Sequence, residues 1–155
     1  MTDSYMSQAI AMSIESVTRD SGGPFAALVV RDGEIVGAGV NQVTSTNDPT
    51  AHAEIVAIRE ACRRLKSFQL SGCDVYTTCE PCPMCLGAIY WARPQRVFFA
   101  NTREDARDIG FDDDFIYREI ALPLDRRSIP MIRVQDDRAL EAFRLWRQKP
   151  DKIRY

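Results

Sequence analysis

His52-Ala53-Glu54 and Pro81-Cys82-Pro83-Met84-Cys85 are the two stretches that decide how this chain folds and what it binds. His52 is the single histidine among 155 residues. One imidazole and two thiolates form a ligand set that suits zinc better than calcium or magnesium. Three protein ligands leave one tetrahedral position for water, whose pKa zinc lowers from ~15.7 to roughly 7. The two stretches therefore predict a zinc site at His52, Cys82 and Cys85, with Glu54 placed to move a proton.

The segments around these stretches have the periodicities of strands and helices joined by short connections. Asp32-Gly33 favours a tight hairpin turn between two apolar strands. Pro83 suits the first position of a helix, so Cys82 and Cys85 are expected at a helix start, three residues apart and on nearly the same side. The expected strands are residues 25–30, 34–40, 73–79 and 96–101, and the expected helices between them are residues 51–65 and 83–91.

Both ends of the chain extend this pattern. Met6, Ile10, Ile14 and Val17 lie at helical spacing and predict a first helix with one apolar face. Residues 128–134 are expected to add an edge strand, and residues 136–149 a final helix before Pro150. The order of elements predicts an α/β fold of three layers, with a mixed five-stranded sheet and helices on both faces.

Length and composition limit the class of protein. A chain of 155 residues with 45% hydrophobic residues predicts a single domain, residues 1–155, with a real core. No basic stretch followed by an apolar run begins the chain, and five cysteines fit a reducing compartment better than a disulfide framework. We therefore expect a cytoplasmic protein without a membrane segment. A net charge of −2 argues against a large nucleic-acid surface.

Two plainer interpretations of the cysteines stay open. The first is a closed structural zinc site that Cys79 or Cys73 would complete, in a non-catalytic module for binding proteins. It gives no reason for Glu54 beside the only histidine. The second is an iron–sulfur site, because Cys79, Cys82 and Cys85 are evenly spaced, but residues 86–89 are Leu, Gly, Ala and Ile and supply no fourth ligand.

Longer blocks around the two stretches carry a family resemblance. Residues 47–54, Asn-Asp-Pro-Thr-Ala-His-Ala-Glu, and residues 79–94, from Cys79-Glu80-Pro81-Cys82 to Arg93-Pro94, resemble the bacterial guanine deaminases of the cytidine-deaminase-like superfamily. Gly22-Gly23-Pro24-Phe25, Gly110-Phe111-Asp112-Asp113 and the final Tyr155 extend the resemblance over most of the chain. It implies a zinc-dependent hydrolase that converts guanine to xanthine and ammonia.

The resemblance also implies roles for individual residues. His52, Cys82 and Cys85 would bind zinc, Glu54 would shuttle protons to the ring nitrogen and the departing amine, and Asp113 would accept from guanine N–H groups or assist proton transfer. The implied substrate contacts are Asn41, Phe25, Ala53, Trp91 and Tyr155. Taken without the family, Phe25 and Trp91 are ordinary core candidates, Asn41 a turn residue and Asp113 a helix cap.

The C-terminal tail, residues 150–155, is implied to cross to a partner subunit and to cover its active site. This predicts a domain-swapped homodimer that takes a small free base and not a polynucleotide. Other aminated rings, such as ammeline, guanosine and cytosine, stay open as substrates, because small changes in pocket walls change which ring fits. Adenosine in transfer RNA is a further alternative, disfavoured by the weak negative charge.

Overall fold

A mixed four-stranded sheet forms the centre of residues 1–116, the first of two compact units in the chain. The computed structural model describes residues 2–155. The strands β1 (Ala26–Arg31), β2 (Glu34–Val40), β3 (Cys73–Cys79) and β4 (Arg96–Asn101) lie in the order β2-β1-β3-β4. β1 is antiparallel to both of its neighbours, whereas β3 and β4 are parallel. A parallel pair needs a crossover, and α4 (Pro83–Ala92) supplies it.

The hairpin between β1 and β2 turns where the sequence predicts. Asp32 and Gly33 have φ angles of 52° and 82°. Two consecutive positive φ values define the type I′ turn, whose twist matches that of the strands it joins. The predicted ranges of β2, β3 and β4 agree with the structure, and β1 is displaced by one residue.

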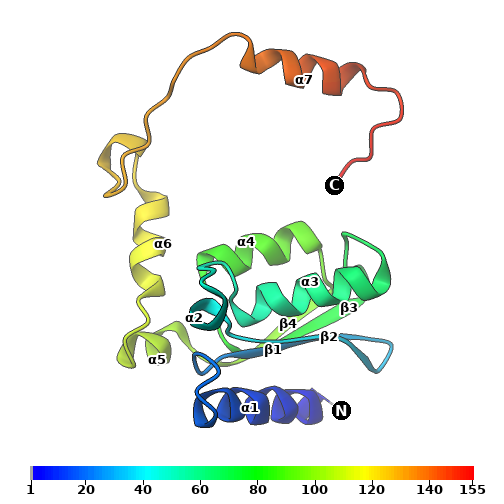
Figure 1. Ribbon diagram of the computed structural model, residues 1–155, viewed down its shortest axis with the longest axis vertical. Helices are drawn as coiled ribbons and strands as arrows, with labels where there is room; N and C mark the ends of the chain where they lie inside the picture. The colour runs from blue at the N-terminus through cyan, green and yellow to red at the C-terminus, as the bar shows by residue number, and fades with distance from the viewer. Residues whose placement is uncertain (1) are drawn as a thin grey trace. The chain divides into compact units, whose positions relative to one another are not determined.

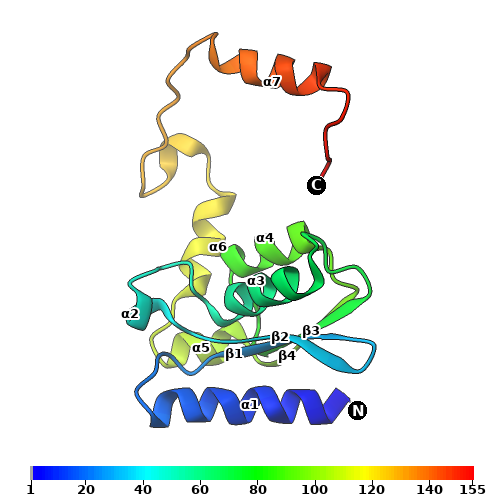
Figure 2. The same ribbon diagram turned by 45° about the vertical axis from the view of Figure 1, so that its right-hand side comes forward.

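Helices cover both faces of the sheet, as predicted. Helix α1 (Thr2–Thr18) lies on one face, and α3 (Ala53–Leu65) and α4 lie on the other (Figure 1). The same two layers flank the sheet when the molecule is turned by 45° (Figure 2). Ala27, Val29 and Val75 point to α3, whereas Leu28, Val30 and Tyr76 point to α1. This alternation is that of strands buried on both faces.

Helix α3 packs unusually close to β2 because β2 carries glycine where the two meet. A Cβ atom on Gly39 would lie 2.3 Å from the carbonyl oxygen of Ala53, and one on Gly37 would lie 2.4 Å from that of Ala57. No side chain fits there, so both positions require glycine for the approach of the helix backbone. The contact fixes the start of α3, which is where His52 and Glu54 lie.

The buried face of α1 differs from the prediction. Ile14 is 59% exposed and Ile10 and Val17 are also exposed, whereas Ala9, Ser13 and Ser16 are buried. The sheet offers large side chains to this helix, among them Tyr76 and Phe98, so that small residues fit at the contact. The periodicity located the helix correctly but not the face that it buries.

The predicted fifth strand is absent from residues 2–155. Residues 128–134 have no regular secondary structure and no backbone partner in a sheet, and Pro130 has no N–H to donate. The expectation of five strands was therefore wrong for this chain, whose sheet has four. No helix in the described range combines the length and apolar character that a membrane crossing requires.

Three further short helices were not predicted from the sequence. They are α2 (Val43–Thr46), between β2 and α3, and α5 (Arg103–Asp108) and α6 (Asp113–Ala121), after β4. The second compact unit, residues 117–155, contains the end of α6, a 3₁₀ turn at Leu124–Arg126 and α7 (Ala139–Gln148), which agrees with the predicted final helix.

Candidate active site

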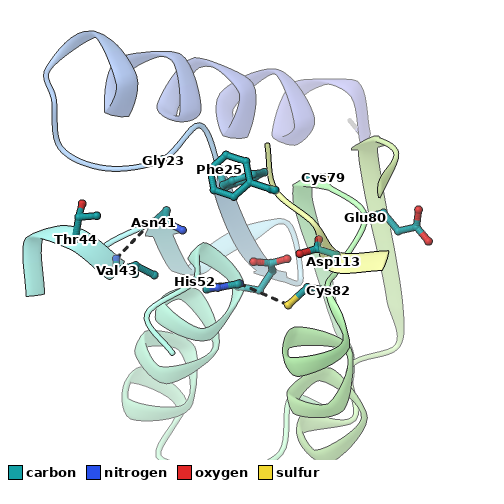
Figure 3. Close-up of a pocket in the computed structure, with 12 residues that line it drawn as sticks. Gly23, Phe25, Asn41, Val43, Thr44, His52, Cys79, Glu80, Cys82 and Asp113 are labelled. Atoms are coloured by element: carbon teal, nitrogen blue, oxygen red, sulfur yellow. Dashed lines mark hydrogen bonds between the residues drawn. The ribbon is translucent and has the colours of Figure 1, made fainter. Parts of the chain in front are cut away.

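His52, Cys82 and Cys85 come together at the starts of two helices. His52 is the N-cap residue of α3, and Cys82 is the N-cap residue of α4, with Pro83 directly after it. The Nδ1 atom of His52 lies 3.5 Å from the Sγ atoms of both cysteines. Figure 3 shows the contact between His52 and Cys82. The three donor atoms all lie within 4.8 Å of one another.

These separations fit a zinc ion. With zinc–sulfur and zinc–nitrogen bonds of about 2.3 and 2.05 Å, a tetrahedral site places sulfur and nitrogen about 3.6 Å apart. The observed 3.5 Å to each sulfur is close to that spacing. Cys79 is not part of the donor cluster. Among the described residues the cluster thus offers three ligands, as expected for a site with an open position and not for a closed structural site.

The environment of Cys82 favours its thiolate. A hydrogen bond from the Cys85 thiol, together with bonds from His52 and the Cys85 N–H, lowers the pKa of Cys82 to about 4. The same pairing with Cys82, together with burial, raises the pKa of Cys85. The N-terminal end of α4 adds the positive end of its dipole. The cluster therefore favours a thiolate at Cys82, and binding of a metal cation would favour loss of the Cys85 proton as well.

Glu54 lies in the first turn of α3, two residues after His52, and is 6% exposed. Burial is the largest cause that raises the pKa of its carboxyl group. A buried carboxyl group with a raised pKa, beside a metal donor cluster, is suited to take up and release a proton. Its position agrees with the predicted role beside the metal.

A cavity of about 220 Å³ opens over the donor cluster. Pockets for drug-sized ligands are typically about 300–1,000 Å³, so this one suits a small ring. Phe25 forms an apolar wall, where Phe111 packs edge-on against it with ring centroids 4.8 Å apart. The cavity is lined by Gly23, Phe25, Asn41, Val43, Thr44, His52, Glu54, Cys79, Glu80, Cys82, Phe111 and Asp113.

Polar groups also line the cavity. Asn41 closes β2 and is 7% exposed, and its Oδ1 accepts a hydrogen bond of 3.2 Å from the N–H of Val43 (Figure 3). Asp113 begins α6 and projects into the cavity. Burial raises the pKa of Asp113, and the charge of Cys82 adds to the effect. The arrangement combines a metal site, a buried proton carrier and polar contacts in one small space.

Residues 1–101 match the family model described as the cytidine and deoxycytidylate deaminase zinc-binding region. The chain belongs to this family. The matched range ends with β4, so it contains the whole sheet, all three metal donors and Glu54. The zinc ligands of this family member are the His52, Cys82 and Cys85 cluster described above.

Three relatives show how far the likeness extends. Guanine deaminase of Bacillus subtilis is 50% identical over 153 residues, 99% of this chain and 98% of its own. Its X-ray structure superimposes with a TM-score of 0.96, with the same coverage. The structure of guanine deaminase from Nitrosomonas europaea has a TM-score of 0.67 at 34% identity, covering 70% of this chain and 63% of that one. The tRNA-specific adenosine deaminase of Buchnera aphidicola is 41% identical over 106 residues, 68% of this chain and 70% of its own. The zinc deaminase fold, predicted from the sequence, is thereby confirmed.

The predicted substrate contacts are distributed unevenly in the structure. Phe25 and Asn41 line the cavity, together with the candidate catalytic residue Asp113. Ala53 is fully buried in the first turn of α3 and is not among the lining residues. Trp91 lies near the far end of α4, is 63% exposed and is not among them either. Tyr155 belongs to the second compact unit.

Several lining residues were not predicted from the sequence. Phe111 is brought to the cavity by the turn after α5, where Gly110 has a φ of +97°. Val43 and Thr44 reach it from the short helix α2. Gly110 is a sequence signal for this turn, because an isolated glycine between polar helices marks a turn. Burial raises the pKa of Cys79, on the cavity wall, to about 12, so this thiol stays neutral.

Proposed function

We propose that this zinc deaminase hydrolyses guanine to xanthine and ammonia. The observation that carries the proposal is one small cavity that opens at the cluster of three zinc donors and is lined by a buried carboxyl group, an amide and an aromatic ring. The choice of guanine among aminated rings is supported by the full-length likeness, at 50% identity, to a guanine deaminase. The free cysteines agree with a reducing compartment, which we propose to be the cytoplasm.

The reaction adds water to C2 of the purine ring and to the ring nitrogen beside it. The bond from C2 to the amine then breaks, ammonia leaves and C2 becomes a carbonyl carbon. His52, Cys82 and Cys85 would hold the zinc, which makes water a nucleophile at neutral pH. Glu54 takes one proton from that water and delivers it to the ring nitrogen, and then carries the second proton, from the new hydroxyl on C2, to the departing amine. Its burial keeps competing water away from the proton it carries.

Three residues that line the cavity would orient the substrate. Phe25 offers its ring as a wall for a planar base. The Oδ1 of Asn41 already accepts from Val43, so its amide N–H groups are the part that meets an acceptor on the base. Asp113 would accept from the ring N–H and amine groups of guanine. A base with donors on one edge and a carbonyl on another satisfies both residues.

A substrate panel tests this proposal. We expect the zinc-loaded protein to release ammonia from guanine and to leave adenine, cytosine, guanosine, ammeline and a transfer RNA anticodon stem-loop largely unchanged. The measurement is ammonia release, with xanthine identified by chromatography. Turnover of another base in place of guanine would refute the substrate assignment. If no compound in the panel released ammonia, the proposal that the protein is a deaminase would be refuted.

We further propose that the protein is a homodimer in which the tail, residues 150–155, reaches the partner's active site with Tyr155. Two features of residues 117–155 support a partner. Ile132, Val134 and Phe143 are large, apolar and exposed. The segment also has ten Lys and Arg residues against six Asp and Glu, whereas the chain as a whole is negative. Both features favour packing on an acidic, apolar surface.

Subunit mixing tests the exchange of the tail. Two variants are prepared, one lacking residues 150–155 and one with Glu54→Gln, each expected to be almost inactive. If the tail acts on the partner, unfolding and refolding the two together should restore activity, because the intact tail then covers the intact site. Sedimentation reports the dimer. A monomer at micromolar concentration, or a mixed dimer that stays inactive, would contradict the proposal.

A further inference from the structure

Gly22 lies directly against the main chain of Asn41, outside the lining of the cavity. A Cβ atom at this position would lie 2.0 Å from the carbonyl oxygen of Asn41 and 3.1 Å from its carbonyl carbon. The φ angle of Gly22 is not in the left-handed region, so the backbone conformation itself does not require glycine. The position requires glycine because two backbone segments touch there.

The contact adds to a set of bonds that hold Asn41 in one orientation. The N–H of Asn41 donates to the carbonyl oxygen of Phe25 at 3.1 Å, and the N–H of the next residue, Gln42, donates to that of Ala51 at 2.9 Å. The N–H of Val43 donates to the Asn41 side chain (Figure 3). Both flanking peptide groups and the amide oxygen are thus engaged, so a shift of this backbone moves the amide group with it.

We infer that Gly22 is a positioning residue for substrate recognition and acts through Asn41. The inference rests on the proposed function, since it assumes that the Asn41 amide donates to the base. A methyl group at position 22 meets backbone atoms, which cannot rotate away as a flexible side chain can, so one of the two backbone segments must shift. The proposal is that the Asn41 peptide moves. Hydrogen bonds weaken steeply with misalignment. The loss of one such bond lowers affinity up to about tenfold.

Gly22→Ala is therefore expected to raise KM for guanine about tenfold and to leave kcat within about twofold of the wild-type value. Gly87→Ala is the matched control. A Cβ atom on Gly87, in α4, would meet nothing within 4 Å, so this variant is expected to have wild-type kinetics. Zinc content and thermal unfolding are measured for each protein, and an unchanged KM in folded Gly22→Ala would overturn the inference.

The Asn41→Ala background separates positioning from a general structural effect. If Gly22 acts through Asn41, Gly22→Ala raises KM in the wild-type background and adds nothing in the Asn41→Ala background. A purely structural defect would raise KM by the same factor in both backgrounds, and that result would overturn the inference. Asn41→Ala itself is expected to raise KM about tenfold.

Pro24→Ala serves if Gly22→Ala does not fold. It loosens the segment that carries Gly22 without adding volume, and is expected to raise KM about threefold, again only when Asn41 is present. Equal effects in both backgrounds would refute the positioning role. Failure of the proposed function can be distinguished from failure of this inference, because in that case the wild-type protein itself does not deaminate guanine. The same comparison is then made with the base of the panel that is deaminated.

Discussion

Glu54→Gln is expected to lower kcat on guanine by about 10²–10⁴-fold while zinc remains bound at one ion per chain. The amide has the shape of the carboxyl group but cannot take up a proton from water or return it to the ring. Glu54 is not a member of the metal donor cluster, so the cluster keeps all three of its ligands. Turnover is followed by ammonia release, and zinc by elemental analysis of the purified variant.

Glu60→Gln is the matched control for this variant. Glu60 lies on the same helix, α3, and its Oε2 accepts a hydrogen bond of 2.7 Å from the N–H of Ala38 on the edge of the sheet. A glutamine oxygen can accept the same bond, so kcat is expected to stay within about twofold of wild type. If Glu54→Gln retained wild-type kcat with its zinc, the proposed proton shuttle would be wrong.

The metal donors were predictable from the sequence because their geometry is local. Cys82 and Cys85 are three residues apart, on either side of the helix-starting Pro83, and the structure places them at the start of α4 as expected. His52 and Glu54 lie together at the start of α3. The one long-range feature is that the starts of α3 and α4 lie close together. It could be predicted because a single zinc ion needs ligands from both stretches.

Features that depend on packing between distant segments were not predictable in the same way. The apolar stripe of α1 predicted Ile10 and Ile14 at the core, but the large residues of the sheet select the small face of Ala9 and Ser13. The apolar character of residues 128–134 predicted a strand, but a strand exists only where a neighbour pairs with it. The periodicity of a sequence describes one helix or strand by itself, and it does not show which other segment packs against that helix or strand.

The walls of the cavity show the same limit. Trp91 shares a helix with Cys85, yet six residues separate them, and the tryptophan lies near the other end of α4, away from the cavity lining. Phe111 and Asp113 lie in an acidic segment that has the composition of a solvated loop, and the turn after α5 brings both to the cavity. The resemblance to a family indicated Asp113, which composition alone does not.

Zinc removal is expected to abolish turnover and to lower the thermal midpoint by about 10 °C. A ligand present at about 1,000 times its Kd stabilises a protein by about 4 kcal/mol, and each kcal/mol corresponds to about 2–4 °C in a chain of this size. Cys85→Ser should have the same two effects as dialysis against a chelator, and only the dialysed wild type should recover when zinc is returned. Calorimetry measures the thermal midpoint, and ammonia release measures turnover.

Cys79→Ser decides between an open catalytic site and a closed structural one. The Cys79 thiol lies on the cavity wall and donates to the carbonyl oxygen of Thr102 at 3.6 Å, apart from the donor cluster. Its burial raises its pKa to about 12, which opposes the thiolate that a zinc ligand must form. Cys79→Ser is therefore expected to keep one zinc per chain with unchanged affinity. Loss of zinc from this variant would mean four protein ligands, no position for water, and hence no hydrolysis at this site.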